Sequence, residues 1–210
     1  MICEHLIKIE QFMLNYAGDS AHNADHIYRV LNQALMIAKN YDVNEDILVA
    51  ACLLHDIGRP AQFDNPNICH AQVGSEMAYS FLKCLGWSED DCRSVKHCIL
   101  THRFRNNMPP ESIEAKILFD SDKLDVCGAL GIARTLQYEG KMNESLDAFF
   151  SEYDRKLIKL YDLFYTETAK QMALSRKKIL LSFYSELKDQ LDQSEAQNWL
   201  NIAKTHINPE

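Results

Sequence analysis

The stretch 53–58, LLHDIG, combines the residue types best suited to metal chemistry. An apolar helical run places His55 and Asp56 side by side just before a glycine that ends the helix. Neighbours on a helix point about 100° apart, so both side chains bind one ion only if it lies near the seam between them. Imidazole nitrogen with carboxylate oxygen suits Zn, Mn, Fe, Co or Ni better than Ca. Taken alone, the pair is equally consistent with a buried, hydrogen-bonded His–Asp pair.

The surrounding sequence strengthens the metal interpretation. Histidines and aspartates cluster upstream in the segment 22–30 and downstream in the segment 120–125, and six of the eight histidines lie between positions 22 and 102. In this arrangement the sequence resembles the HD superfamily of metal-dependent phosphohydrolases, whose pattern is a His, a later His-Asp pair and a distant Asp. The matching residues are His26, His55, Asp56 and Asp122.

The resemblance covers about residues 20–140 and is closest to the small bacterial HD hydrolases. It implies an all-α HD-domain helical bundle in which the four matching residues bind one divalent transition metal ion: Mn, Co, Ni, Fe or Zn, with Mg also acceptable. Two histidines and two carboxylates leave coordination positions open for water and a phosphoryl oxygen. We expect Asp56 both to bind the ion and to orient that water, as a catalytic residue.

Three more histidines could take part in the chemistry. In HD branches with two metals, extra histidines bind the second ion, and His70 and His102 could supply that set. The sequence favours a single metal instead, with His70 and His97 binding substrate phosphates and His102 as the catalytic general acid. His97 and His102 are about 140° apart around a helix, so we do not expect them to serve one point. A helix-capping role for His70 is the simpler alternative.

Two cationic residues are candidate phosphate ligands. Arg29 lies three residues after His26 on the same helical face, and its alternative role is an ion pair with Asp25. Lys123 directly follows the last metal ligand, and its alternative is an ion pair with Asp120. Both are expected to bind substrate.

Other charged residues are expected near the rim of the site. Asp125 stands three residues after Asp122 and is expected to contact the metal ligands without binding the ion itself. Arg59, Arg103 and Arg105 border the presumed cleft loops and could attract an anion, although solvated charge is the commoner outcome.

The elements that hold these residues must be helical. Gly (7) and Pro (5) are scarce in 210 residues, while Leu and Ala are abundant, which excludes a β-sandwich or a doubly wound sheet. A loop is expected over 59–69. Apolar periodicity predicts helices over about 5–17, 25–38, 44–57, 71–85, 88–103, 111–123 and 125–139.

The C-terminal part of the chain has a different composition and hydrophobic pattern. Residues 143–205 contain no Gly or Pro and are amphipathic throughout, which predicts two long helices that meet near 165–168. We therefore expect an HD metal-binding catalytic domain over 1–140 and a helical extension over 141–210, packed on the same domain. A homodimer surface on the extension is also compatible with its aromatic residues.

Charge and composition limit the partners. The net charge of −8 argues against a broad nucleic-acid surface, but a bound metal ion makes a small anionic substrate acceptable. No run of 18 apolar residues and no signal peptide are present, so we expect no membrane association. The seven cysteines form no CxxC pair, which is typical of a cytoplasmic protein.

The segment 120–134 is most similar to the HD branch that contains nucleoside triphosphate pyrophosphohydrolases. The similarity implies hydrolysis of a nucleoside triphosphate to a monophosphate and pyrophosphate, while monophosphatase and cyclic-nucleotide phosphodiesterase activities stay open. One alternative is a non-catalytic sensor that binds metal and nucleotide. Another is a two-iron oxygenase on the HD scaffold, which would need both His70 and His102 as ligands.

Overall fold

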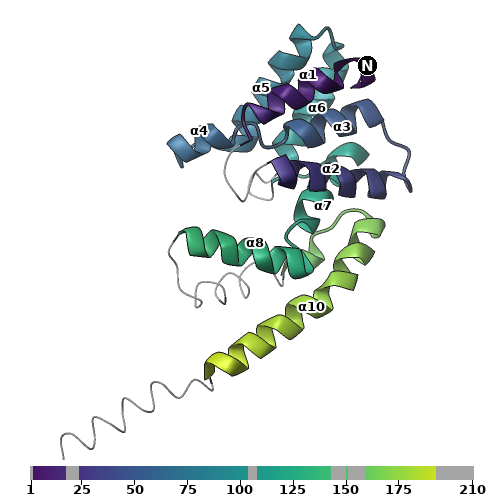
Figure 1. Ribbon diagram of the computed structural model, residues 1–210. Coiled ribbons are helices and arrows are strands. Elements are labelled where there is room, and N and C mark those ends of the chain that lie inside the picture. The colour runs from purple at the N-terminus through teal and green to yellow at the C-terminus, as the bar shows by residue number, and fades with distance from the viewer. Residues whose placement is uncertain (1, 18–23, 104–107, 143–149, 151–158, 193–210) are drawn as a thin grey trace, which may run out of the picture.

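The protein is all-α, as the sequence predicted. The computed structural model describes residues 2–17, 24–103, 108–142, 150 and 159–192, and helices are the regular secondary structure of these ranges (Figure 1). None of the described helices is long and apolar enough to cross a membrane. The elements are α1 (Ile2–Leu14), α2 (Ala24–Ala38), α3 (Glu45–Leu54), α4 (Arg59–Asp64), α5 (His70–Cys84), α6 (Glu89–Thr101), α7 (Ile113–Leu124), α8 (Gly128–Lys141), the 3₁₀ helix η3 (Lys159–Asp162) and α10 (Glu167–Asp192).

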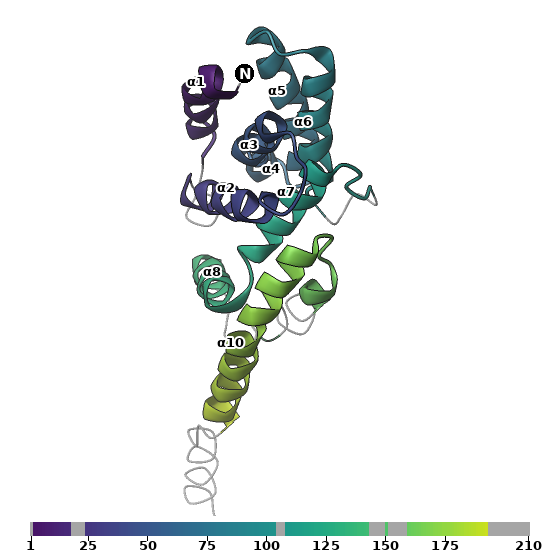
Figure 2. The ribbon, with the colours of Figure 1, turned by 90° about the vertical axis from the view of Figure 1, so that its right-hand side faces the viewer.

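Helix α3 forms the centre of the bundle made by α1–α7 (Figure 2). It packs against α1, α2, α6 and α7, and its residues from 47 to 54 are buried apart from Val49. The side chain of Asn44 caps its N-terminus by accepting a hydrogen bond from the Ile47 amide. A helix that is apolar on nearly all sides belongs in a core, so α3 carries the residues at its C-terminal end into the interior.

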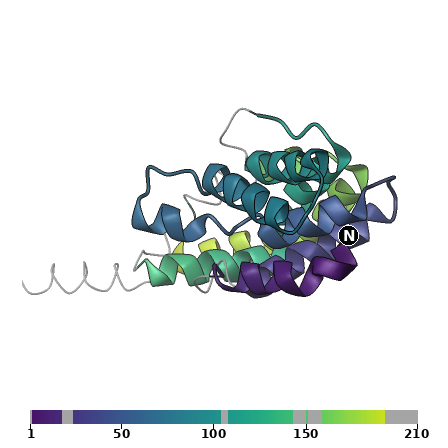
Figure 3. The same cartoon turned by 90° about the horizontal axis from the view of Figure 1, so that it is seen from above.

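The segment 59–69, expected as a loop, begins with the short helix α4. Pro60 stands in the first turn, where its missing N–H costs nothing and its fixed φ favours a helix. Helix α4 lies at one edge of the bundle, next to α5 (Figure 3).

Gly58 lets the turn after α3 press against the start of α5. A Cβ at this position would overlap the backbone carbonyl of His70 and lie 2.7 Å from the amide nitrogen of Gly74. The lack of a side chain at Gly58 therefore brings Asp56 and His70 close together.

Helices α8 and α10 pack against each other below the α1–α7 bundle (Figures 1 and 2). Asp120 on α7 anchors the start of α10, because its carboxylate accepts hydrogen bonds from the amides of Tyr165 and Thr166 and from the Thr166 hydroxyl. Burial nevertheless raises the pKa of Asp120. Most of the first predicted C-terminal helix lies outside the described residues, and the domain division at residue 140 stays a prediction.

Candidate metal centre

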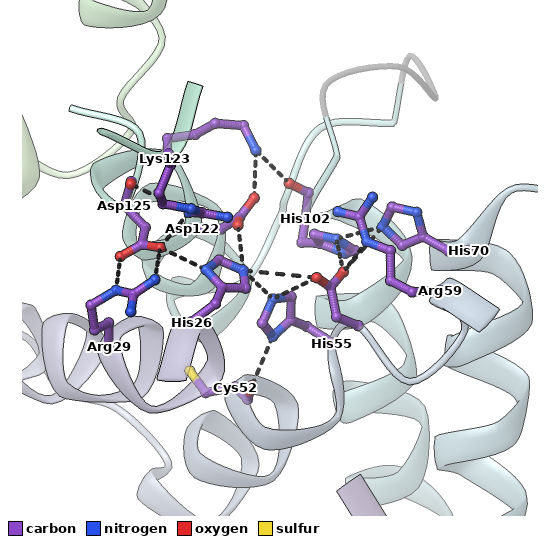
Figure 4. A network of polar contacts seen from close by, with 12 residues as sticks. His26, Arg29, Cys52, His55, Arg59, His70, His102, Asp122, Lys123 and Asp125 are labelled. Carbon is purple, nitrogen blue, oxygen red and sulfur yellow. Dashed lines mark hydrogen bonds and ion pairs between the residues drawn. The ribbon is translucent and has the colours of Figure 1, made fainter. Parts of the chain in front are cut away.

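Four histidines and two aspartates meet in the core (Figure 4). They come from α2, from α7, from the C-terminal ends of α3 and α6, and from the first residue of α5. All are buried except Asp122, whose side chain is 18% exposed. The six residues are His26, His55, Asp56, His70, His102 and Asp122.

The first half of the centre contains His26, His55, Asp122 and one oxygen of Asp56. The Nε2 atoms of His26 and His55 are 3.4 Å apart, and each lies 3.7 Å from Oδ2 of Asp56. The His26 Nε2 atom is also 3.5 Å from Oδ1 of Asp122. The structure thus brings together the four residues to which the sequence analysis assigned the metal.

The second half contains His70, His102 and the other oxygen of Asp56. The two Nε2 atoms are 3.3 Å apart, and they lie 3.2 Å (His70) and 3.8 Å (His102) from Oδ1 of Asp56. Asp56 therefore stands between two groups of nitrogen donors and turns one oxygen toward each.

In the first half, the histidine nitrogens that face away from the centre have fixed acceptors. Nδ1 of His26 lies 2.7 Å from Oδ2 of Asp125, and Nδ1 of His55 lies 2.8 Å from the carbonyl oxygen of Cys52. A carboxylate and a carbonyl only accept hydrogen bonds, so each Nδ1 carries a proton, and in the neutral ring Nε2 turns a lone pair toward the centre.

The second half repeats this arrangement. Nδ1 of His70 meets the side-chain oxygen of Gln62, and Nδ1 of His102 meets the carbonyl oxygen of Ile99. Such outer hydrogen bonds fix the ring orientation and the tautomer of metal-binding histidines. In its neutral form, each of the four rings can therefore bind a metal through Nε2.

An unpaired oxygen indicates that this donor set fits a cation. Oδ2 of Asp56 is buried and has no hydrogen-bond partner among the described residues, which costs about 1–3 kcal/mol for a polar atom without compensation. The nearest histidine nitrogens, Nε2 of His26 and His55, lie 3.7 Å away, too far for a hydrogen bond. Imidazole nitrogens and carboxylate oxygens are the ligands that divalent transition metals prefer, so these residues fit such an ion.

Two basic side chains keep the carboxylates ionised. Burial would raise the pKa of Asp56, but Arg59, whose Nε donates to Oδ1 at 2.9 Å, and the nearby histidines hold that pKa well below its usual value. Burial would likewise raise the pKa of Asp122, and Lys123, 2.7 Å from its Oδ2, outweighs this effect together with His26. Both aspartates are therefore charged and ready to bind a cation.

The histidines respond differently to burial. Burial lowers the pKa of His55, lowers that of His102 well below its usual value, and lowers that of His70 to about 4. For His26 the same effect is outweighed by hydrogen bonds to Asp122 and Asp125, so its pKa is raised. Burial thus favours the neutral form of His55, His70 and His102, which is the form that binds metals.

Arg29 and Lys123 make their hydrogen bonds to partners that the sequence did not suggest. Arg29 binds both carboxylate oxygens of Asp125 at 2.8 and 3.0 Å, whereas the sequence offered Asp25 as its alternative partner. Arg134 on α8 contacts the same carboxylate. Lys123 pairs with the metal-facing Asp122 and donates to the carbonyl of residue 102 at 3.3 Å. Binding of substrate by Arg29 and Lys123 stays a prediction.

His97 lies apart from the centre. Its Nε2 accepts a hydrogen bond from the Glu111 amide at 3.2 Å, and it lines a separate hollow of about 250 Å³ together with Arg93 and Ser112. The separation of His97 from His102 agrees with their different directions on α6. Binding of substrate by His97 also stays a prediction.

Two residues that contact the centre, Arg59 and Gln62, were not expected there from the sequence. Arg59 was assigned to the cleft rim, although its position three residues after Asp56 was the available signal. Gln62 gave no signal, because the segment that carries it was expected to be a loop.

Comparison with known proteins agrees with this geometry. Residues 23–127, which include all six residues of the centre, match the family model described as HD domain. The chain is 27% identical to the Bacillus subtilis protein YpgQ over 186 residues, which is 85% of this chain and 88% of YpgQ. A crystal structure of YpgQ in complex with ADP has a TM-score of 0.74 at 26% identity and covers 89% of this chain and 98% of YpgQ. A predicted HD superfamily hydrolase from an uncultured Thermotogales bacterium has a TM-score of 0.67 at 29% identity, with 89% and 93% covered.

Proposed function

This chain belongs to the HD domain family, and we propose that it is a metal-dependent phosphohydrolase acting on nucleotides. The reaction that we favour converts a nucleoside triphosphate to a monophosphate and pyrophosphate. The observation that carries the proposal is Asp56, whose two buried oxygens face two separate groups of histidine Nε2 atoms. Divalent ions bound there would supply a more acidic water and neutralise charge on a phosphoryl group.

The geometry supports two ions, where the sequence alone favoured one. His70 and His102 form a second three-ligand group with Asp56, and both their Nδ1 atoms have acceptors. His102 is neutral, and its proton is held on the side away from the centre. It therefore lacks a proton to give to a leaving group, which favours the role of ligand over that of general acid.

The remaining residues would orient the ligands and attract the substrate. Asp125 fixes the ring of His26, and Arg29 and Arg134 in turn fix Asp125. The Lys123 ammonium, next to Asp122, adds positive charge at the rim, where phosphates of a substrate would approach.

The choice of a nucleotide substrate is supported by two lines of argument. YpgQ, to which this chain is similar along most of its length, has been crystallised with ADP. The segment 120–134 also resembles the pyrophosphohydrolase branch of the superfamily. Nucleotides are therefore the first substrates to test.

A two-iron oxygenase is a second candidate. This activity would need both His70 and His102 as ligands, and the two residues lie together beside Asp56. Two bound irons and consumption of oxygen would favour it. A nucleotide sensor is the third, and it would bind nucleotide in the presence of metal without turnover.

The deciding experiment combines metal analysis of the purified protein with a screen for phosphate and pyrophosphate release. The screen uses Mn²⁺ and a panel of ribo- and deoxyribonucleotides, with Asp56→Asn as the control. We expect pyrophosphate release that falls by at least about a thousandfold in the variant, because losing ligands to the ions removes several kcal/mol of transition-state stabilisation. Equal release by both proteins, or no bound metal in the wild type, would refute the proposal.

A further inference from the structure

Arg59 forms an ion pair with Asp56 in the second half of the candidate metal centre. It is the first residue of α4, and its side chain turns back so that Nε donates to Oδ1 of Asp56 at 2.9 Å (Figure 4). This is the oxygen that faces His70 and His102. The Arg59 side chain is 22% exposed, whereas that of Asp56 is 2% exposed, so the pair connects the core with the surface.

The guanidinium and a metal ion would make conflicting use of this oxygen. The guanidinium takes one of the about two lone-pair sites of Oδ1, so a metal ion at the remaining site would lie directly beside it. Two cations a few ångströms apart also repel each other strongly at a buried site. An ion held by His70, His102 and Asp56 would therefore weaken the contact that Arg59 makes.

The position of Arg59 allows its side chain to move. Helix α4 has six residues, none of them buried, and lies at the edge of the bundle. The side chain can turn outward without repacking the core. Arg29 differs, because it holds both oxygens of Asp125, a residue that contacts Nδ1 of His26 on the side away from the centre.

We propose that Arg59 is an exchangeable counter-cation of Asp56. Arg59 competes with a divalent ion for Oδ1 of Asp56. When an ion is bound to Oδ1, the guanidinium of Arg59 turns to a phosphate of the substrate. Guanidinium suits this second contact, since its planar fork matches phosphate geometry. The contact with phosphate rests on the proposed function, whereas the competition with metal does not.

Arg59→Gln tests both parts with binding measurements. Isothermal titration calorimetry with Mn²⁺ should show about tenfold tighter binding in the second half, equivalent to about 1.4 kcal/mol. With saturating Mn²⁺, the non-hydrolysable 2′-deoxyadenosine 5′-(α,β-methylene)triphosphate should bind about tenfold more weakly. A residue that served only to hold the structure would not move these two affinities in opposite directions.

The matched control is Arg93→Gln, which removes an exposed arginine that pairs with Glu89 and should change neither affinity. Arg59→Lys keeps the charge and should shift both affinities less, in the same directions, and it replaces the Gln variant if that variant does not fold.

Weaker or unchanged Mn²⁺ binding in Arg59→Gln would overturn the competition. Unchanged binding of the analogue would overturn the phosphate contact. If the wild type itself does not bind the analogue, the nucleotide assignment of the proposed function fails, while the Mn²⁺ titration still decides the competition.

Discussion

The two halves of the candidate metal centre contain similar potential ligands, but different groups hold those ligands in place. In the first half, His26 rests on the ionised carboxylate of Asp125, which Arg29 and Arg134 tie to α2 and α8. In the second half, Nδ1 of His70 contacts the neutral amide oxygen of Gln62. Gln62 belongs to α4, a short helix at the edge of the bundle. One half is thus embedded in a charged network between packed helices, and the other borders a small peripheral element.

This difference suggests a division of tasks. A carboxylate partner makes a metal-binding histidine more basic than an amide partner does, so the first half should bind its ion more tightly. The second half, where Arg59 shares the oxygen of Asp56, should bind more weakly and respond to the substrate. The following variants test this comparison, from the largest expected effect to the smallest.

Removing one histidine from each half should distinguish the two proposed ions. We expect His55→Gln to lose the tightly bound Mn²⁺ and at least about a thousandfold in kcat/KM, since ions at such sites contribute several kcal/mol. His102→Gln should lose only the weaker Mn²⁺ and somewhat less activity. Calorimetric titration with Mn²⁺ and pyrophosphate-release assays measure both effects. If His102→Gln keeps the full number of ions, the single-metal interpretation from the sequence is correct.

Changing the outer partners should weaken each half separately. Asp125→Asn removes the charge behind His26, and we expect about a hundredfold loss of Mn²⁺ affinity in the first half. Gln62→Met keeps the approximate volume but removes the acceptor of His70, with about a tenfold loss in the second half. Calorimetry at fixed pH measures both. Equal losses in the two variants would contradict the difference in support.

Gly58→Ala should disturb the second half more than the first. The added Cβ would overlap the backbone carbonyl of His70, and overpacking of this kind costs about 1–3 kcal/mol of unfolding free energy. Urea unfolding in EDTA measures this cost, and Mn²⁺ titration shows which half is affected. Gly140→Ala is the matched control on α8, where a Cβ meets nothing within 4 Å. It should stabilise the helix by about 0.5–1 kcal/mol.

His97→Gln should have the smallest effect. The ring lies away from both halves and accepts a hydrogen bond from the Glu111 amide, so we expect kcat/KM within about twofold of the wild type. Steady-state kinetics with the nucleotide found in the screen would measure it. A tenfold rise in KM would instead support the substrate contact that the sequence predicted.

The first half was readable in the sequence because its signal is local. An apolar helix that ends in adjacent His55 and Asp56 has a characteristic pattern, and the distant His26 and Asp122 complete a recognised motif. The all-α fold was likewise predictable, since helix propensity and the scarcity of Gly and Pro act along the whole chain.

The second half could not be predicted, because the sequence does not show in which direction its side chains point. His70 and His102 lie at the ends of α5 and α6, where a shift of one residue changes the direction of a side chain by about 100°. The positions of Arg59 and Gln62 follow from a helix that periodicity did not reveal, because six residues are too few to show a period.

The sequence by itself therefore determined the helical class, the family pattern and the residues of the first half, through local spacing and composition. The tertiary structure decided that Asp56 serves two groups of histidines, and that Asp125 and Gln62 support opposite sides of the centre. These contacts join residues that are distant in the chain or held by an unpredicted turn, so they arise only when the helices pack.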